Sequence, residues 1–318
     1  MAKHTPQSLL ERAAEMYDFG AALRAPAAAP APKPAPEPAP EPVPIVELVP
    51  PAPVVEALTP VVEIPAPRPR PVFGVAEVDR VALAEAGFIV PEGDVTGIAE
   101  EFRLVKHQLL AAIEGDKASP DERRRAVLIC SAQPKSGKTF CAVNLALSLA
   151  GERDVEVLLI DGDFPKPDVL ATLGVAGNRS GLVEALADPS IDIESLIIRT
   201  DVPGLSVLPA GRKTNNVPEL LASDRTREVL AKLVAGDGRR IILFDSPPAL
   251  MASHATVLAG HVGQALVVVR ADQTTEADLR ETLGLLSGCD HLSLILNGAG
   301  LAVTGRKFGA YDGYGHDE

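Results

Sequence analysis

The chain has 318 residues, of which 43 are acidic and 30 are basic, so its formal net charge is −13. This acidic balance argues against a general nucleic-acid-binding protein, which would carry a basic surface. Its cysteines lack the paired spacing of a zinc site or a disulfide framework, which indicates a reducing, cytoplasmic setting. No run approaches the roughly 20 apolar residues that span a bilayer, so we expect a membrane to be reached only through a partner.

The first 71 residues differ in composition from the rest of the chain. Apolar residues recur at near-helical spacing between Ser8 and Arg24, which predicts a short amphipathic helix within residues 1–25, with a frayed tail as the alternative. Residues 26–71 are dominated by Pro, Ala, Glu and Val, and proline at this density excludes helix and central strand. We therefore expect a disordered, Pro-rich spacer in front of the folded region.

The folded region is predicted to open with two helices. A short helix is expected over Asp79–Ala86, and a longer one over Ile98–Ile113. The longer helix should bury one apolar face, which would consist of Ile98, Phe102, Val105, Leu109 and Ala112.

From Ala126 onward the pattern alternates between strand and helix. Strands are predicted at Ala126–Ser131, Val155–Asp161, Leu205–Pro209, Arg240–Asp245, Ala265–Val269 and Leu292–Asn297. Helices are predicted at Lys138–Ala150, Gly181–Ala187, Val217–Ala235, Ala252–Ala259 and Thr275–Gly288. Several strands are apolar without alternation, which is typical of strands covered on both faces. The sequence thus predicts an α/β fold over residues 72–303, a mostly parallel sheet with helices on both faces.

The most informative segment is Val127–Thr139, where a buried strand leads through a turn into an amphipathic helix that begins at Gly137-Lys138-Thr139. Free N–H groups and the helix dipole at such a start attract anions. Gly137 lets the backbone approach a phosphate, Lys138 would neutralise phosphate oxygens, and Thr139 would bind Mg²⁺ through its hydroxyl. Ala132 stands where the GxxxxGK[ST] pattern has its first glycine, and an ordinary helix start is the alternative. A nucleotide site is predicted at Ser136, Gly137, Lys138, Thr139 and Phe140.

Three carboxylates follow two of the predicted strands. Asp161 and Asp163 come after one strand, and Asp245 ends another. Ligands of parallel sheets bind at the carboxyl ends of the strands, and a buried carboxylate without a partner is costly. Mg²⁺ would offset that cost, so a metal site is predicted at Thr139, Asp163 and Asp245, with Asp161 and Asp163 orienting water or accepting a proton. Helix-capping or loop carboxylates are the alternative.

Together these motifs resemble the bacterial tyrosine kinase (BY-kinase) family within the MinD/ParA-like P-loop ATPases, over roughly Ile98 to Asn297. Lys138 and Thr139 match the Walker A motif, and Asp245 with Pro247-Pro248 matches Walker B. The Walker A′ motif is matched by Asp161, Asp163 and Lys166-Pro167. A further family segment is matched by Leu208–Gly211 together with Asn216–Ser223. The amphipathic start and the Pro-rich spacer most resemble the exosortase-associated branch, the exopolysaccharide tyrosine autokinases.

The resemblance implies an ATP-dependent protein-tyrosine autokinase that regulates exopolysaccharide or capsule biosynthesis and export, with ATP and Mg²⁺ as cofactors. Lys138, Asp161 and Asp163 would be the catalytic residues, with Asp161 as the base or the group that orients the phenol. Asn297 is implied to contact adenine, with a capping or turn role as the alternative. Tyr311 and Tyr314, in a flexible tail over residues 304–318, would be the phosphoacceptors, with an inert tail as the alternative.

The resemblance also implies partners. Glu100, Arg103 and Lys106 resemble the E-x-x-R-x-x-R helix that assembles the family's subunits into a ring, and residues three apart share a helix face. A solvated charged face is the alternative. A second implied partner is the cytoplasmic part of a membrane chain-length-determinant-type activator, which would place this chain peripherally at the inner face of the plasma membrane.

Departures from the family pattern keep two other functions open. Lys135 stands where the family usually has Gly, Pro165 where it has Arg, and the tail holds only two tyrosines. These changes favour a weakly active or inactive ATP-binding regulator of polysaccharide export as the first alternative. A ParA/MinD-type positioning ATPase is less favoured, because the signature lysine of that group is replaced here by Gln133.

Overall fold

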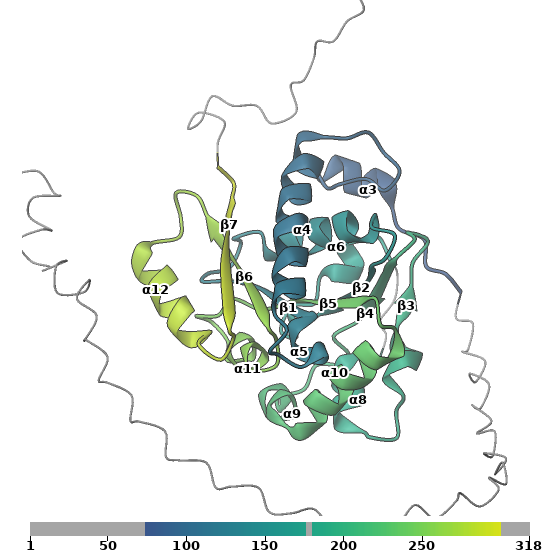
Figure 1. The fold of residues 1–318 in the computed structure, drawn as a ribbon, viewed down its shortest axis with the longest axis vertical. Coiled ribbons are helices and arrows are strands. Elements are labelled where there is room, and N and C mark those ends of the chain that lie inside the picture. The colour runs from purple at the N-terminus through teal and green to yellow at the C-terminus, as the bar shows by residue number, and fades with distance from the viewer. Residues whose placement is uncertain (1–73, 176–179, 300–318) are drawn as a thin grey trace, which may run out of the picture. The chain divides into compact units, whose positions relative to one another are not determined.

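The computed structural model describes residues 74–175 and 180–299, in which a central sheet is covered by helices on both faces (Figure 1). The sheet has seven strands in the order β3-β4-β2-β5-β1-β6-β7. Neighbouring strands are parallel, except that β3 runs antiparallel to β4. The predicted fold class is therefore confirmed. The predicted N-terminal helix, the Pro-rich spacer and the tail with Tyr311 and Tyr314 lie outside the described residues.

All six predicted strands are present, with bounds that differ by at most two residues from the prediction. The strands are β1 (Ala126–Ser131), β2 (Glu156–Asp161), β3 (Ile198–Arg199), β4 (Leu205–Leu208), β5 (Arg240–Asp245), β6 (Gln264–Arg270) and β7 (His291–Asn297). Strand β3 was not predicted, because two residues are too few to carry a pattern.

Within the described residues, the predicted helices are present, except that one is split. They are α3 (Arg80–Glu85), α4 (Gly97–Gly115), α5 (Asp121–Arg124), α6 (Lys138–Ala150), α7 (Val169–Thr172), α8 (Leu182–Ala187), the 3₁₀ turn η1 (Ile193–Leu196), α9 (Val217–Ala222), α10 (Asp224–Gly236), α11 (His254–Ala259) and α12 (Glu276–Leu285). Helices α5 and α7 and the turn η1 were not predicted. The single helix predicted over Val217–Ala235 is wrong, because Ser223 adopts an extended backbone between α9 and α10.

Two apolar layers hold the sheet. One layer packs α4 and α6 against the first face, and the other packs α8 to α11 against the second (Figure 1). Successive residues of β1 alternate between them, with Val127 and Ile129 in the first layer and Leu128 and Cys130 in the second. Each buried aliphatic side chain contributes roughly 1.5–3 kcal/mol, so the central strands that carry the site are firmly fixed.

Helix α4 is rotated relative to the predicted apolar face. Phe102 and Leu109 are buried as expected, but Ala112 is exposed and Ile113 is buried in its place. Lys106 is also buried, because its stem lies on the inward side. The rotation therefore separates Lys106 from the exposed Arg103 of the same predicted charged face.

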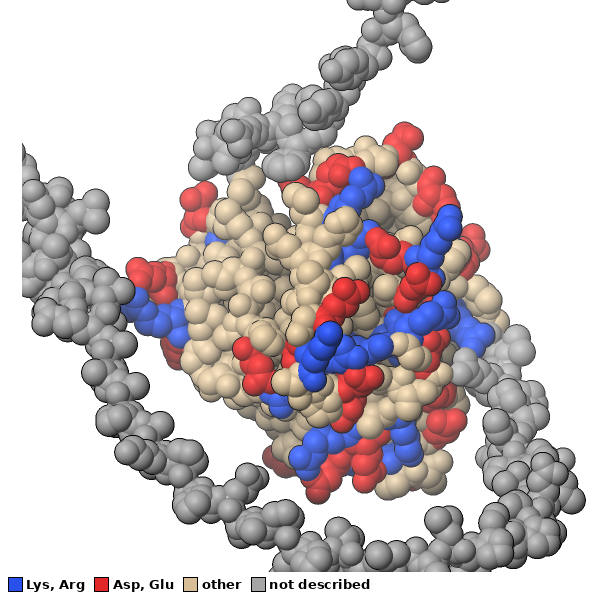
Figure 2. Space-filling view, in the orientation of Figure 1, with Lys and Arg blue, Asp and Glu red and all other residues tan. Residues whose placement is uncertain are grey.

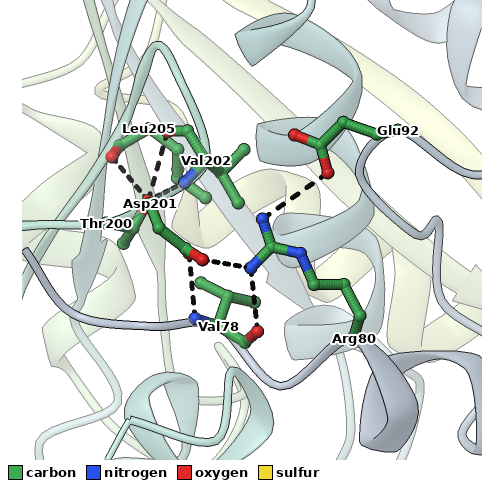
Figure 3. A network of polar contacts seen from close by, with 7 residues as sticks. All are labelled: Val78, Arg80, Glu92, Thr200, Asp201, Val202 and Leu205. Atoms are coloured by element: carbon green, nitrogen blue, oxygen red, sulfur yellow. Dashed lines mark hydrogen bonds and ion pairs between the residues drawn. The ribbon is translucent and has the colours of Figure 1, made fainter.

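The segment before α3 closes the β3 edge of the sheet. Ala76 forms a parallel bridge with Thr200, and its N–H donates to the carbonyl of Arg199 at 2.8 Å. Asp201 then accepts hydrogen bonds from the Val78 N–H at 2.9 Å and from the Arg80 guanidinium, which also reaches Glu92 (Figure 3). This network ties the first described residues to the β3 edge of the sheet.

Asp201→Ala should lower the free energy of unfolding by about 1–2 kcal/mol, because it leaves the Val78 N–H without its acceptor and removes one of the acceptors of the Arg80 guanidinium. Urea unfolding followed by circular dichroism measures this change. Arg280→Ala is the matched control, because Arg280 and Glu276 form an exposed i,i+4 pair that contributes about 0.5 kcal/mol or less. Equal losses in the two variants would contradict the role given to Asp201.

At the other end of the sheet, β7 leaves one side of its backbone without a neighbouring strand among the described residues. Leu294 and Leu296 are 55% and 64% exposed, and the strand carries no Lys, Arg, Asp or Glu. Figure 2 shows an uncharged surface around β7, whereas acidic and basic side chains are mixed over the helices of the second layer. Within the described ranges, no helix is long and apolar enough to cross a membrane.

Candidate functional site

The loop between β1 and α6 is compact and is held by its own polar groups. The hydroxyls of Ser131 and Ser136 both donate to the carbonyl of Gln133, each at 2.8 Å. Gly137 has φ +91°, in the left-handed region that favours glycine. The first amide bonded within α6 is that of Cys141, which donates to the Gly137 carbonyl at 2.9 Å. The amides before it at the helix start have no intrahelical acceptor and are available to an anion.

Lys138 is the first residue of α6, and its side chain is buried among carboxylates rather than solvated. The residue is 7% exposed. Burial lowers the pKa of its ammonium group, while the charges of Asp245 and Asp163 oppose that shift. A buried ammonium next to the free amides of the loop is a built site for phosphate oxygens.

The hydroxyl of Thr139 donates to Oδ2 of Asp245 at 2.6 Å, which joins the start of α6 to the end of β5. Asp245 is almost fully buried, and its other oxygen, Oδ1, has no hydrogen-bond partner in the described part of the chain. Burial raises the pKa of Asp245 to about 7. An orphaned buried carboxylate oxygen is costly, and a bound cation would offset that cost.

Asp161 lies directly opposite Asp245 in the pairing of β2 with β5. Its two oxygens accept the backbone N–H groups of Val169, at 3.0 Å, and of Asp163, at 3.3 Å. Burial raises the pKa of Asp161 to about 7, against the lowering effect of these hydrogen bonds. The carboxyl is thus held rigidly at the carboxyl edge of the sheet.

Asp163 is half-buried on the loop after β2. Burial raises its pKa, and the charges of Lys138 and Lys166 act in the opposite direction. The neighbouring Gly162 donates its N–H to the Asp245 carbonyl at 2.7 Å, and a Cβ at Gly162 would lie 2.8 Å from that same oxygen. Close backbone contact therefore brings the carboxylates of β2 and β5 to one place.

The oxygen donors fit Mg²⁺. A hydroxyl, a half-buried carboxylate and an orphaned carboxylate oxygen, from Thr139, Asp163 and Asp245, are the ligand types that this ion prefers. Among residues 74–175 and 180–299, no group of three His, Cys, Asp or Glu side chains is arranged to hold a metal by itself. Mg²⁺ does not need such a cage, because it usually keeps several waters and binds phosphate oxygens as well.

The side chains of two predicted nucleotide-binding residues, Phe140 and Asn297, contact other protein residues in the structure. The Phe140 ring packs against Phe88 and Phe102, with centroid distances of 4.9 and 6.4 Å, so this residue offers the site its backbone only. Asn297 donates its side-chain N–H to the Ser136 carbonyl at 2.9 Å. Asn297 therefore reaches the phosphate loop itself.

The three residues of the predicted ring-forming helix do not act alike. Arg103 pairs with Glu100 at 2.5 Å on the surface of α4. The ammonium of Lys106 instead pairs with Glu152 at 2.6 Å and donates to the Ser148 carbonyl, within the same chain. Arg103 is exposed and Glu100 is partly exposed, whereas Lys106 is buried and connects α4 to the end of α6.

Sequence reasoning missed two supports of the site. The Gln133 amide donates to Asp278 of α12 at 2.9 Å, and the Ala249 N–H donates to the Ser131 carbonyl at 2.8 Å. It also missed His254, whose ring packs on Phe164 and whose buried Nδ1 has no partner in the described residues. Gln133 lies in the phosphate-loop motif, but nothing in the sequence pairs it with Asp278. Ala249 and His254 carry no motif, so no local signal could have found these contacts.

A Gly-Lys-Thr loop after β1, with carboxylates at the ends of β2 and β5 of a mostly parallel sheet, is the arrangement of the P-loop nucleoside triphosphatase fold. A family of AAA domains matches residues 126–277. Tyrosine-protein kinase YwqD of Bacillus subtilis is 28% identical over 69% of this chain and 85% of its own length. Tyrosine-protein kinase etk of Escherichia coli is 32% identical over 57% of this chain, which spans only 24% of that relative.

Solved structures of tyrosine kinase domains are also similar to this chain. The kinase domain of the Escherichia coli tyrosine kinase ETK is 27% identical, with a TM-score of 0.58 over 77% of this chain and 88% of that one. The BceF tyrosine kinase domain is 29% identical, with a TM-score of 0.52 over 62% of this chain and 76% of that one. In sequence and in fold, the chain is thus similar to the kinase domains of bacterial tyrosine kinases.

Proposed function

We propose that this chain is an ATP-dependent protein-tyrosine autokinase, which phosphorylates other copies of itself. It would regulate exopolysaccharide or capsule biosynthesis and export. One observation carries the proposal: Lys138, Thr139, Asp161, Asp163 and Asp245 converge at the carboxyl edge of the sheet, beside the free amides of the phosphate loop. The named tyrosine kinases among its relatives support the choice of a tyrosine hydroxyl as acceptor.

The reaction would transfer the γ-phosphoryl group of ATP to the phenol oxygen, with ADP as the leaving group. Lys138 and the amides at the start of α6 would neutralise the phosphate oxygens, and such positioning supplies most of the catalysis in phosphoryl transfer. Asp161, fixed by two backbone N–H groups, would accept the phenol proton or orient the phenol. Mg²⁺, held by Thr139, Asp163 and Asp245, would supply further charge neutralisation.

The acceptors would be Tyr311 and Tyr314, in the segment that follows β7. The exposed Arg103 and the partly exposed Glu100 would contribute to a ring-like assembly of identical subunits, in which the tail of one copy enters the site of its neighbour. A cytoplasmic segment of a membrane chain-length-determinant-type protein would act as the activator and would recruit the chain to the inner face of the membrane.

The test is incubation of the purified chain with labelled Mg·ATP, with and without the cytoplasmic segment of such an activator. We expect phosphotyrosine, stronger with the activator, and its loss in the Tyr311→Phe, Tyr314→Phe double variant. Turnover of ATP without phosphotyrosine under both conditions would reject the kinase and leave an ATP-binding regulator of export. Pro165, exposed beside Asp163 in place of the family arginine, is the observation that favours this second function.

A further inference from the structure

Asn297 stands on a rigid support at the end of β7. The strand pairs with β6 along its whole length, so that Asn297 lies opposite Arg270. The backbone carbonyl of Asn297 also accepts the N–H of Ala271 at 2.9 Å. Its side chain therefore leaves from a backbone that the sheet holds in place.

The side chain reaches the phosphate loop at one atom. Nδ2 of Asn297 donates to the Ser136 carbonyl at 2.9 Å, and the Ser136 hydroxyl is itself tied to Gln133. A trans peptide is planar, and its C=O and N–H groups point in opposite directions. Because Asn297 holds the Ser136 carbonyl, the N–H of Gly137 is turned away from Asn297.

The packing shows that this contact is close. A Cβ at Gly137 would lie 2.0 Å from Nδ2 of Asn297, so the amide occupies the space that any larger residue at this position would need. Gly137 also has a left-handed φ of +91°. The loop conformation and the Asn297 amide are thus matched to each other.

We propose that Asn297 is a positioning residue, which fixes the Ser136–Gly137 peptide so that the amides of the loop face the phosphates of a nucleotide. The inference deepens the proposed function and rests on its nucleotide-binding part only. Asn297 then acts through the loop backbone, and its effect does not depend on the base of the nucleotide.

The test compares dissociation constants of Mg·ATP, Mg·GTP and Mg·tripolyphosphate, measured by calorimetry, for the unchanged chain and two variants. Asn297→Ala removes the donor and should weaken binding of all three by a similar factor, about threefold to tenfold. Asn297→Asp keeps the shape but sets an acceptor against the Ser136 carbonyl, and should weaken all three further. Ser293→Ala, on the same face of β7, is the control and should change none of them.

Weaker binding of ATP alone, with tripolyphosphate unchanged, would assign Asn297 to the base and overturn the proposal. Unchanged binding of all three, or an equal loss in Ser293→Ala, would overturn it as well. Urea unfolding midpoints of the nucleotide-free proteins separate loop positioning from loss of fold, and the isosteric Asp variant keeps the test open if Ala unfolds the strand end. If the unchanged chain binds none of the three ligands, the proposed function fails instead.

Discussion

Lys138→Met is expected to lower phosphotyrosine formation by about a hundredfold to a thousandfold. Methionine has a similar length but no charge, so the phosphate oxygens lose the one lysine that the described fold buries among the site carboxylates. The rate of transfer from labelled ATP to tyrosine, measured at saturating Mg·ATP, gives the effect on the reaction itself.

Lys135→Met is the matched control for that experiment. Lys135 belongs to the same loop, but its side chain is exposed. We expect a change of less than about threefold, because an exposed charge is largely screened by solvent. Comparable losses in the two variants would mean that the net charge of the loop matters rather than the buried ammonium of Lys138.

Asp161→Asn is expected to act in opposite directions on activity and on stability. Phosphoryl transfer should fall by about a hundredfold or more, because the amide cannot accept the phenol proton. At pH 8, without Mg²⁺ and nucleotide, the free energy of unfolding of the variant should nevertheless be higher by ~1–3 kcal/mol. Removing the buried charge outweighs the loss of the acceptor for one of the two backbone N–H groups.

The direction of the stability change follows from the raised pKa of Asp161, which is about 7 in the folded chain against an ordinary value of 3.8. The folded state binds the proton more tightly than the unfolded state, so this contribution to stability is complete below about pH 4 and is lost as the pH rises through 7. Urea unfolding at pH 5 and pH 8 should show a larger fall for the unchanged chain than for the Asn variant. Parallel falls would show that Asp161 is not the group responsible.

The fold could be predicted from the sequence where an apolar run or a motif marked an element over its whole length. The apolar runs of β1 and β5 and the start of α6 at Lys138 gave bounds that the structure reproduces, because a strand buried on both faces must be apolar throughout. Helix α4 was harder, since its rotation depends on packing against α6. The long stem of Lys106 could be buried there while its ammonium met Glu152.

Some contacts of the candidate site could also be predicted from the sequence, and others could not. The approach of Asp161 and Asp245 could be predicted, because residues that end parallel strands share an edge of the sheet. The contact of Asn297 with Ser136 could not, because it joins residues 161 positions apart through one side-chain rotamer. The break at Ser223 was missed because the apolar spacing continues across it, although serine before an acidic residue is a common helix start.

The closed β3 edge and the open β7 edge have a practical consequence for handling the protein. Residue 76 joins the sheet beside β3, whereas residue 299 leaves from β7, and six strand spacings separate these edges, roughly 29 Å. A surface or fluorophore attached to Val75, which is 62% exposed, would therefore sit across the sheet from the end of β7. Immobilisation through that side should leave the β7 end, and the phosphate loop that Asn297 touches, open to nucleotide, to a neighbouring subunit and to a phosphotyrosine antibody.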